Sequence, residues 1–180
     1  YVCTELAKGM SEPTERHVAM LKRCARYLSL RPRVVQLFRW QDFPSTMHTW
    51  VDSNHAGCIR TRKSTTGVVT MFGDNCIRAR CKGQGVIALS SGEAEYYGLT
   101  IGMSEALGDY ALCADLNVKV VPQCLLDATT AISIGSRRGL GNVKHIDTVF
   151  LWVQEIVGSN RVRLGKRGTN EMLADMLTKP

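Results

Sequence analysis

The sequence of 180 residues lacks the marks of several protein classes. No apolar run approaches the roughly 20 residues that a helix needs to cross a bilayer, and no signal-peptide pattern occurs. There is no internal repeat, no low-complexity tract and no CxxC pair, and the His and Cys residues show no zinc-ligand spacing. The first residue is Tyr1 rather than Met, so we interpret the sequence as a fragment of a longer polypeptide. These absences favour an ordinary globular domain with no membrane partner and no zinc centre.

The cysteines and the excess of basic residues give the first positive signals. Seven Cys without paired spacing favour reduced thiols in an intracellular compartment. The formal net charge of +7 favours a polyanionic partner, and a solvated basic surface is the alternative explanation. Composition alone leaves both explanations open.

The predicted secondary structure falls into two parts. A helix over residues 11–30, capped by Ser11, is followed by a strand over 33–40 and a linker to residue 45. From residue 46, β-branched runs, turn residues and apolar periodicity predict the following order: strands 47–52, 67–72 and 76–81, helix 91–115, strand 119–126, helix 127–134, a basic Gly-rich loop 135–144, helix 145–157, strand 161–164 and helix 170–177. Pro122 predicts an edge or a bulge in its strand. This order implies an α/β fold with a mixed sheet and helices packed on it.

Four acidic residues from distant parts of the chain stand at the ends of predicted strands or within predicted helices: Asp52, Glu95, Asp127 and Asp175. Carboxylates that are brought together repel each other, and their pKa values rise unless a cation neutralises them. A divalent metal site is the economical reason to gather them, and in a basic protein such a site suits phosphodiester chemistry. For Asp52 a turn role, and for Asp127 a helix N-cap, are the alternative explanations.

Two glutamates compete for the position on the long helix. Glu95 shares its face with Gly98 and Gly102, a small apolar face suited to lying close against a sheet, so its carboxylate needs a partner. Glu93 lies on a more polar face in the first turn, where a capping or dipole role explains it. We therefore assign Glu95 to the acidic set.

Several phrases of the sequence closely resemble the ribonuclease H domain of copia-type LTR retrotransposon Pol polyproteins. They are TRKSTTG (61–67), ALSSGEAEYYGL (88–99), KHID (144–147) and LADMLTKP (173–180). Residues 11–28 resemble the segment that connects reverse transcriptase to ribonuclease H in the same polyproteins. The resemblance implies a connection segment over residues 1–45 and a ribonuclease H-like domain over 46–180, with a five-stranded mixed sheet flanked by helices.

The resemblance also implies an activity and a site. Asp52, Glu95, Asp127 and Asp175 would bind two Mg²⁺, with Mn²⁺ as a substitute, and would catalyse endonucleolytic hydrolysis of the RNA strand of RNA–DNA hybrids during reverse transcription. The expected partners are the hybrid and an upstream reverse transcriptase domain. The expected location is intracellular, in a cytoplasmic particle or the nucleus.

Basic residues in two loops are the expected contacts with the hybrid, and a solvated surface is the alternative for each. They are Arg60, Arg62, Lys63 and Ser64 in the first loop, and Arg137, Arg138, Lys144 and His145 in the second. For His145 we favour a capping or structural role. The sequence departs from the family pattern after Asp52 (Ser53-Asn54-His55) and after Asp127 (Ala128-Thr129). A decayed copy that only binds or tethers nucleic acid therefore stays open as the alternative to an active enzyme.

Overall fold

The computed structural model describes residues 1–141 and 143–179. Asn142, in the predicted basic loop, and Pro180, at the end of the predicted domain, lie outside the described residues. No described helix combines the length and apolar character that a membrane crossing needs.

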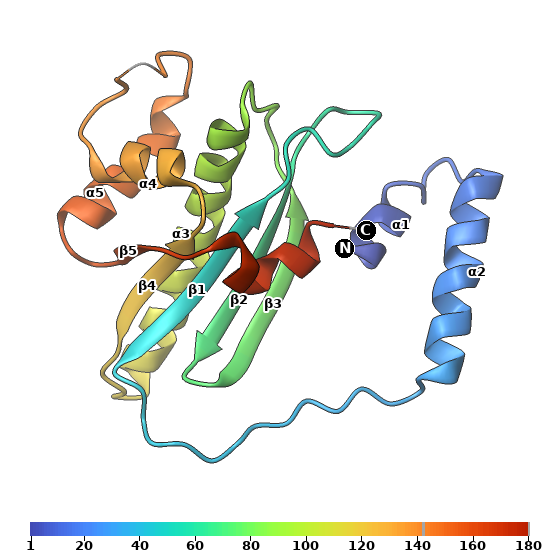
Figure 1. The fold of residues 1–180 in the computed structure, drawn as a ribbon, viewed down its shortest axis with the longest axis horizontal. Helices are drawn as coiled ribbons and strands as arrows, with labels where there is room; N and C mark the ends of the chain where they lie inside the picture. Colours follow the sequence, from blue (N-terminus) through green and yellow to red (C-terminus); the bar gives the residue numbers. More distant parts are fainter. Residues whose placement is uncertain (142, 180) are drawn as a thin grey trace.

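A five-stranded mixed sheet forms the centre of the fold, in the order β3-β2-β1-β4-β5 (Figure 1). The first three strands pair antiparallel, and β4 and β5 extend the sheet in parallel to β1. The strands are β1 (Thr46–Ser53), β2 (Thr65–Phe72), β3 (Asn75–Gly83), β4 (Val121–Leu126) and β5 (Arg163–Lys166). The predicted fold class is confirmed.

The sheet is covered on both faces. The larger hydrophobic cluster lies under three helices, α3 (Ser91–Asp115), α4 (Thr129–Ser136) and α5 (Trp152–Gly158), which follows the short 3₁₀ helix η1 (Thr148–Leu151). A smaller cluster, with Val69 and Met172, lies under the 3₁₀ helix η3 (Leu173–Leu177), which crosses β1 and β2. Neighbouring residues of β1 alternate between these clusters, as the strand period requires.

The long helix α3 lies close against β1 because its inner face is small. Ser90 caps the helix, and its Oγ accepts a hydrogen bond from the N–H of Glu93 at 3.2 Å. A Cβ atom added at Gly98 would lie 2.2 Å from Ser53 Oγ, and one added at Gly102 would lie 2.2 Å from Val51 Cγ2. These glycines set the distance between helix and sheet, and thereby bring Glu95 to the end of β1.

The strand containing Pro122 is interior, between β1 and β5, so the predicted edge strand is wrong. The ladder with β5 begins only at the pair Gln123–Arg163, one residue beyond the proline. Pro122 therefore sits where β4 has no neighbour on the β5 side, and its missing N–H removes no bond from that ladder.

The N-terminal part differs from the prediction in two places. The helix α2 (Glu15–Leu30) begins later than predicted, because Thr14 rather than Ser11 caps it in a capping box with His17. Residues 33–40 are extended but form no strand. Side-chain bonds replace a ladder there, since the Arg39 N–H donates to Asn75 Oδ1 at 2.9 Å and Asn75 Nδ2 donates to the Arg39 carbonyl at 3.0 Å.

The helix α1 (Val2–Ala7) lies beside the β3 edge of the sheet, and α2 contacts α1 on the side away from the sheet (Figure 1). The Thr4 hydroxyl donates to the carbonyl of Cys81, at a distance of 3.4 Å. The exposed apolar side chains of α2 include Val18, Leu21 and Leu28, whose spacing places them along one side of the helix, and we call them the apolar stripe. The stripe belongs to neither hydrophobic cluster of the described chain.

The last part of the chain also differs from the prediction. The predicted final helix is two 3₁₀ segments, η2 (Thr169–Glu171) and η3, and Met172 between them has an extended backbone. The helix predicted from residue 145 begins at Thr148, where Asp147 Oδ1 accepts the N–H of Val149 at 3.3 Å. The segment η3 therefore lies across β1 and β2 as a short 3₁₀ turn, not as the end of a longer helix.

Candidate metal centre

Three of the four predicted acids come together at one end of the sheet. Asp52 lies near the end of β1, Asp127 directly follows β4, and Glu95 lies near the start of α3. One carboxylate oxygen of each lies within 4.8 Å of the others. The parallel register pairs Trp50 with Leu125, so Asp52 and Asp127 each stand two residues further along at the same edge. The carboxyl ends of parallel strands lie at the same edge of a sheet, and ligands of open α/β sheets bind at that edge.

The carboxylate of Glu95 is only half satisfied. Its Oε1 accepts the backbone N–H of Ser53 at 3.2 Å, whereas its buried Oε2 has no hydrogen-bond partner among the described residues. Burial, and next the charges of Asp52 and Asp127, raise the pKa of Glu95 to about 8. A buried carboxylate of this kind requires either a proton or a cation.

Asp52 shows the same electrostatic conflict. Burial raises its pKa, and the charges of Asp175 and Asp127 add to this effect, while a hydrogen bond from the Thr178 hydroxyl to Asp52 Oδ2 opposes it. Oxygen ligands from Asp52, Glu95 and Asp127, together with the open Oε2 of Glu95, fit a hard divalent cation such as Mg²⁺.

Asp127 is free to take part because it does not cap the following helix. The residue at the N-cap is Ala128, and Asp127 Oδ2 instead accepts the Thr169 hydroxyl at 3.0 Å. The alternative explanation of Asp127 as a helix N-cap is therefore wrong. Thr169, which lies 42 residues further along the chain, orients the Asp127 carboxylate through this hydrogen bond.

Asp175 lies beside the group rather than inside it. Its Oδ1 pairs with Lys179 Nζ at 2.5 Å, and its carboxylate is not among the three that converge. It is close enough for its charge to act on Asp52. Thr178, directly after η3, contacts Asp52 through its hydroxyl and Asn54 through its carbonyl.

Glu93, the other glutamate in the first turns of α3, is not among the converging acids and makes contacts within the fold. Its side chain is buried and accepts from the N–H of Leu89 at 3.0 Å and the hydroxyl of Tyr97 at 2.6 Å. His145 Nε2 lies 2.9 Å from Glu93 Oε2. Burial alone would raise the pKa of Glu93, but the hydrogen bonds from Tyr97, His145 and Leu89 outweigh it and keep this pKa below its ordinary value.

The first set of predicted contact residues lies on the loop between β1 and β2. Arg60 and Arg62 are exposed and Lys63 is half-buried. Ser64 is only 1% exposed, and its Oγ accepts the N–H of Ala56 at 3.0 Å. Burial therefore argues against a direct contact from Ser64, whose hydroxyl instead shapes the loop.

The second set lies after α4. Arg138 and Lys144 are exposed, whereas an Arg137 guanidinium nitrogen donates to the carbonyl of Leu140 at 2.6 Å. His145 does not cap a helix, because Asp147 takes that role, so the capping prediction is wrong. The His145 ring instead contacts the carboxylate of Glu93, and the structural role of His145 stays a prediction.

Sequence analysis did not select Gln84, which the structure places beside the site. This side chain is 4% exposed, and its Nε2 donates to Thr66 Oγ1 at 3.0 Å, to the Ala94 carbonyl at 2.8 Å and to Ser53 Oγ at 3.4 Å. Gln84 thus ties the first turn of α3 to the end of β1, on either side of the Glu95 contact. It lies in a loop without periodicity, where no sequence pattern marks a buried amide.

Comparison with known proteins agrees with this fold. No protein-family model matches the chain. A retrovirus-related Pol polyprotein from transposon TNT 1-94 of Nicotiana tabacum is 30% identical over 178 residues, which cover 97% of this chain and 13% of the relative. A second one, from transposon RE1 of Arabidopsis thaliana, is 29% identical over 183 residues and covers 100% of this chain and 12% of the relative. The chain thus spans about an eighth of the length of these relatives.

Two solved structures that share this fold are those of ribonuclease H proteins. The N-terminal ribonuclease H domain of Rv2228c from Mycobacterium tuberculosis superposes with a TM-score of 0.54 at 18% identity, covering 75% of this chain and 91% of that one. LC11 ribonuclease H1, solved in complex with an RNA/DNA hybrid, superposes with a TM-score of 0.50 at 17% identity, covering 73% and 93%. At this level of identity the likeness concerns the fold.

Proposed function

Because the chain belongs to the retrovirus-related Pol polyproteins of transposons and has the ribonuclease H fold, we propose that it hydrolyses the RNA strand of RNA–DNA hybrids during reverse transcription. The observation that carries the proposal is the convergence of Asp52, Glu95 and Asp127 within 4.8 Å, with a buried and unpartnered oxygen on Glu95. The bound hybrid of the structural relative LC11 ribonuclease H1 supports the choice of substrate.

In this proposal the three converging carboxylates hold Mg²⁺, or Mn²⁺ in its place, and Asp175 completes a site for two ions. The ions would supply Lewis-acid chemistry and an activated water for attack on a phosphodiester. The chain's own residues fix the geometry. Ser53 orients Glu95, Thr169 orients Asp127, and Thr178 orients Asp52, each through one hydrogen bond.

The pair between Asp175 and Lys179 has a place in the same proposal. Lys179 Nζ pairs with Asp175 Oδ1 at 2.5 Å, and the Lys179 side chain is exposed, so the pair is weak. Asp175 would therefore be able to release Lys179 and hold a divalent cation together with the other three acids.

Recognition of the RNA strand requires contacts to 2′-hydroxyls and to the backbone rather than to base edges. The exposed side chains of Arg60, Arg62, Arg138 and Lys144 are the residues we assign to backbone contact. Arg137 and Lys63 are partly buried and can contribute at the margins of this surface.

The alternative is a copy that binds hybrids without cleaving them. Its support is the departure from the family pattern at Asn54 and at Ala128, next to two of the acids. Asn54 is fully engaged, because its Oδ1 accepts the N–H of Thr65 at 2.8 Å and its Nδ2 donates to the Thr178 carbonyl at 3.1 Å. A structural use of Asn54 leaves the three carboxylates intact, which favours the active enzyme.

We further propose that residues 1–45 are a connection segment and that the apolar stripe of α2 docks on an upstream reverse transcriptase domain. The stripe is exposed on α2, with Val18 at 45% and Leu21 at 58% exposure. An amphipathic helix normally buries such a stripe. An intracellular site of action, in a cytoplasmic particle or the nucleus, belongs to the same proposal and is supported by seven cysteines that are all free in the described chain.

Cleavage of end-labelled duplexes tests the proposed activity. Wild-type protein with Mg²⁺ should cut the RNA strand of an RNA–DNA hybrid and leave its DNA strand, a DNA duplex and an RNA duplex intact. Asp52→Asn should bind the hybrid and cut it at background rate. Binding of the hybrid without any cleavage by the wild type would support the decayed copy instead.

A further inference from the structure

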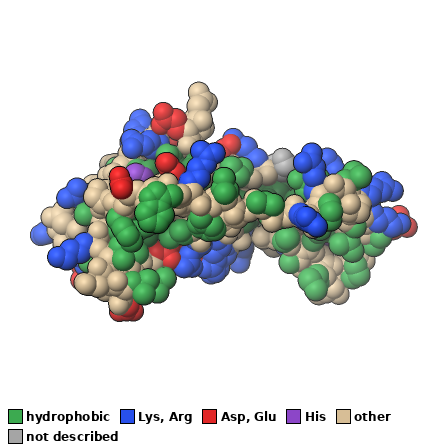
Figure 2. All heavy atoms as spheres, turned by 90° about the horizontal axis from the view of Figure 1, so that it is seen from below, with side chains coloured by type: hydrophobic (Ala, Val, Ile, Leu, Met, Phe, Trp, Pro, Cys, Tyr) green, Lys and Arg blue, Asp and Glu red, His purple; other side chains and the backbone are tan. Residues whose placement is uncertain are grey.

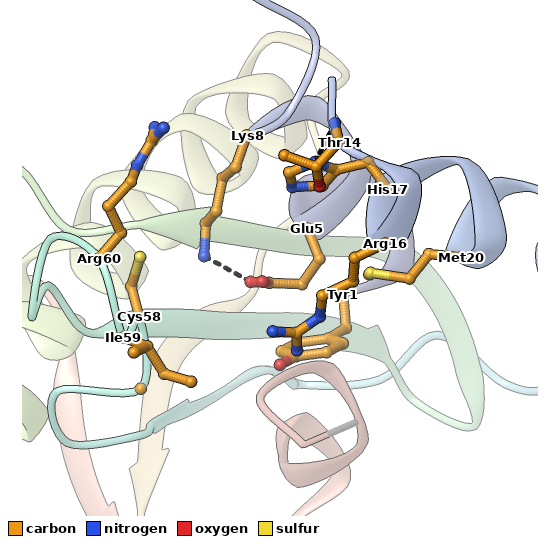
Figure 3. Close-up of a pocket in the computed structure, with 11 residues that line it drawn as sticks. Tyr1, Glu5, Lys8, Thr14, Arg16, His17, Met20, Cys58, Ile59 and Arg60 are labelled. Carbon is orange, nitrogen blue, oxygen red and sulfur yellow. Dashed lines mark hydrogen bonds and ion pairs between the residues drawn. The ribbon is translucent and has the colours of Figure 1, made fainter. Parts of the chain in front are cut away.

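A basic cavity lies where the N-terminal helices meet the loop between β1 and β2. It measures about 420 Å³ and is lined from α1 by Lys8, from α2 by Arg16 and from the loop by Arg60 (Figure 3). The ammonium of Lys8 pairs with Glu5, whereas no ion pair recorded among the described residues involves Arg16 or Arg60. The cavity thus joins the loop predicted to touch the hybrid to the first turn of α2.

The basic side of α2 continues away from this cavity. Arg16, Arg23 and Arg26, with Lys22 beside them, recur at spacings that place them on one side of the helix. All four are exposed, and none of the ion pairs recorded among residues 1–141 and 143–179 involves them. One acid, Glu15, lies on the same side, so this surface keeps a net positive charge.

The apolar stripe of α2 points in another direction. In the right-hand lobe of Figure 2, hydrophobic side chains gather along the lower side, and Lys and Arg side chains lie on the upper and outer sides. A protein docked on Val18, Leu21 and Leu28 would therefore leave the basic side free. Beyond the helix, exposed Arg31 and Arg33 extend the positive charge into the following segment.

We propose that the basic side of α2, continued through the Arg16–Arg60 cavity onto the β1–β2 loop, binds the sugar–phosphate backbone of the substrate duplex away from the carboxylate cluster. The helix has 16 residues and is about 24 Å long at about 1.5 Å per residue, which matches roughly seven base pairs of a duplex. Arginines spaced along one side suit phosphate contacts, since they carry charge without reading base edges. This inference rests on the proposed function for the identity of the duplex.

The test compares two hybrids of different length. In an Asp52→Asn background, dissociation constants are measured by fluorescence anisotropy for hybrids of about 10 and about 24 base pairs, over a series of KCl concentrations. The variant is Arg16→Gln/Arg23→Gln/Arg26→Gln, and circular dichroism verifies that its helix content is kept. The matched control is Lys119→Gln/Arg161→Gln/Arg163→Gln, which removes three exposed charges near β4 and β5.

The α2 variant should bind the long hybrid at least about tenfold more weakly than its parent, with a salt slope lower by about 2 to 3, and should bind the short hybrid as its parent does. The control should differ little from the parent on both. An equal loss on both hybrids would overturn the inference by placing the basic side close to the carboxylate cluster. No loss on the long hybrid would overturn it as well, and would direct the basic side to an acidic protein surface. If the parent binds neither hybrid, the proposed function itself fails.

Discussion

The backbone N–H of Ser53 at the end of β1 donates to Oε1 of Glu95 on α3 at 3.2 Å, while Oε2 of the same carboxylate has no partner among the described residues. The bond fixes the direction of the side chain, and one oxygen of the same carboxylate lies within 4.8 Å of an oxygen of Asp52 and of Asp127. A buried carboxylate held in this way can bind a cation directly, and its negative charge destabilises the fold when no cation is bound. The predictions below follow from this relationship and from the contacts that support it.

The metal-free protein should lose stability as the pH rises. Because the pKa of Glu95 is about 8 in the folded protein and about 4.5 in the unfolded chain, its contribution is present below about pH 4.5 and is lost as the pH rises through about 8. In EDTA, Glu95→Gln should match the wild type at pH 5 and exceed it at pH 9 by on the order of a few kcal/mol. Thermal unfolding at both pH values measures this.

Addition of Mg²⁺ at pH 9 provides the control. It should raise the unfolding temperature of the wild type and leave Glu95→Gln nearly unchanged. A stability difference between the two proteins that stays constant from pH 5 to pH 9 would contradict the raised pKa of Glu95.

Loss of the Tyr97 hydroxyl should destabilise the fold. This hydroxyl donates to Glu93 Oε1 at 2.6 Å in a buried position. The variant Tyr97→Phe keeps the ring contact with Phe150 but leaves a buried carboxylate short of one donor, so unfolding in urea should cost about 1–3 kcal/mol less. Tyr110→Phe, at a 38% exposed tyrosine, should change stability little. Equal effects of the two variants would exclude a structural role for the Glu93 network.

Gln84 should affect the response to Mg²⁺ and not stability alone. Gln84→Leu removes the donor that links Ala94 of α3 to Thr66 of β2 and Ser53 of β1, so α3 is held less firmly against both strands. The Mg²⁺ concentration for half-maximal hydrolysis should rise severalfold. Gln154→Leu also removes the hydrogen bonds of a side-chain amide, a partly buried one to Ile134 and two exposed ones with Gly139, but away from the site. A shift of the same size in both variants would mean that Gln84 acts only through general stability.

The close contact between α3 and β1 should make one glycine intolerant of a methyl group. Gly102→Ala would place Cβ 2.2 Å from Val51 Cγ2 and should destabilise by about 1–3 kcal/mol, as overpacked cores do. Gly108→Ala on the same helix meets no atom within 4 Å, and should stabilise by about 0.5–1 kcal/mol. Urea denaturation of the two variants gives the comparison, and a stable Gly102→Ala would disprove the close approach.

The sequence predicted the sheet and the three converging acids because each has a local signal. The acids Asp52 and Asp127 follow β-branched or apolar runs that end in turns, and Glu95 stands on a face of small residues. Parallel pairing of the two strands then brings the aspartates to one edge. Only α3, whose cap and glycine face are both local features, was predicted with its observed bounds.

What the sequence did not predict depends on contacts between distant segments. Ser64 and Gln84 are buried by neighbours far along the chain, and neither position has a periodic pattern. Aspartate is a residue type that often caps helices, but the carboxylate of Asp127 accepts a hydrogen bond from Thr169 and does not cap α4. The segment at residues 33–40 has strand propensity without an available strand edge, because side chains of Gln36 and Asn75 occupy the backbone groups there.

The most direct test of the account compares the two glutamates of α3 in hydrolysis. Single-turnover cleavage of an RNA–DNA hybrid at saturating Mg²⁺ is measured for the wild type, Glu95→Gln and Glu93→Gln, at a temperature where all three are folded. The account predicts that Glu95→Gln cleaves at least about 100-fold more slowly and that Glu93→Gln stays within about tenfold of the wild type. Loss of cleavage in Glu93→Gln with retention in Glu95→Gln would contradict it.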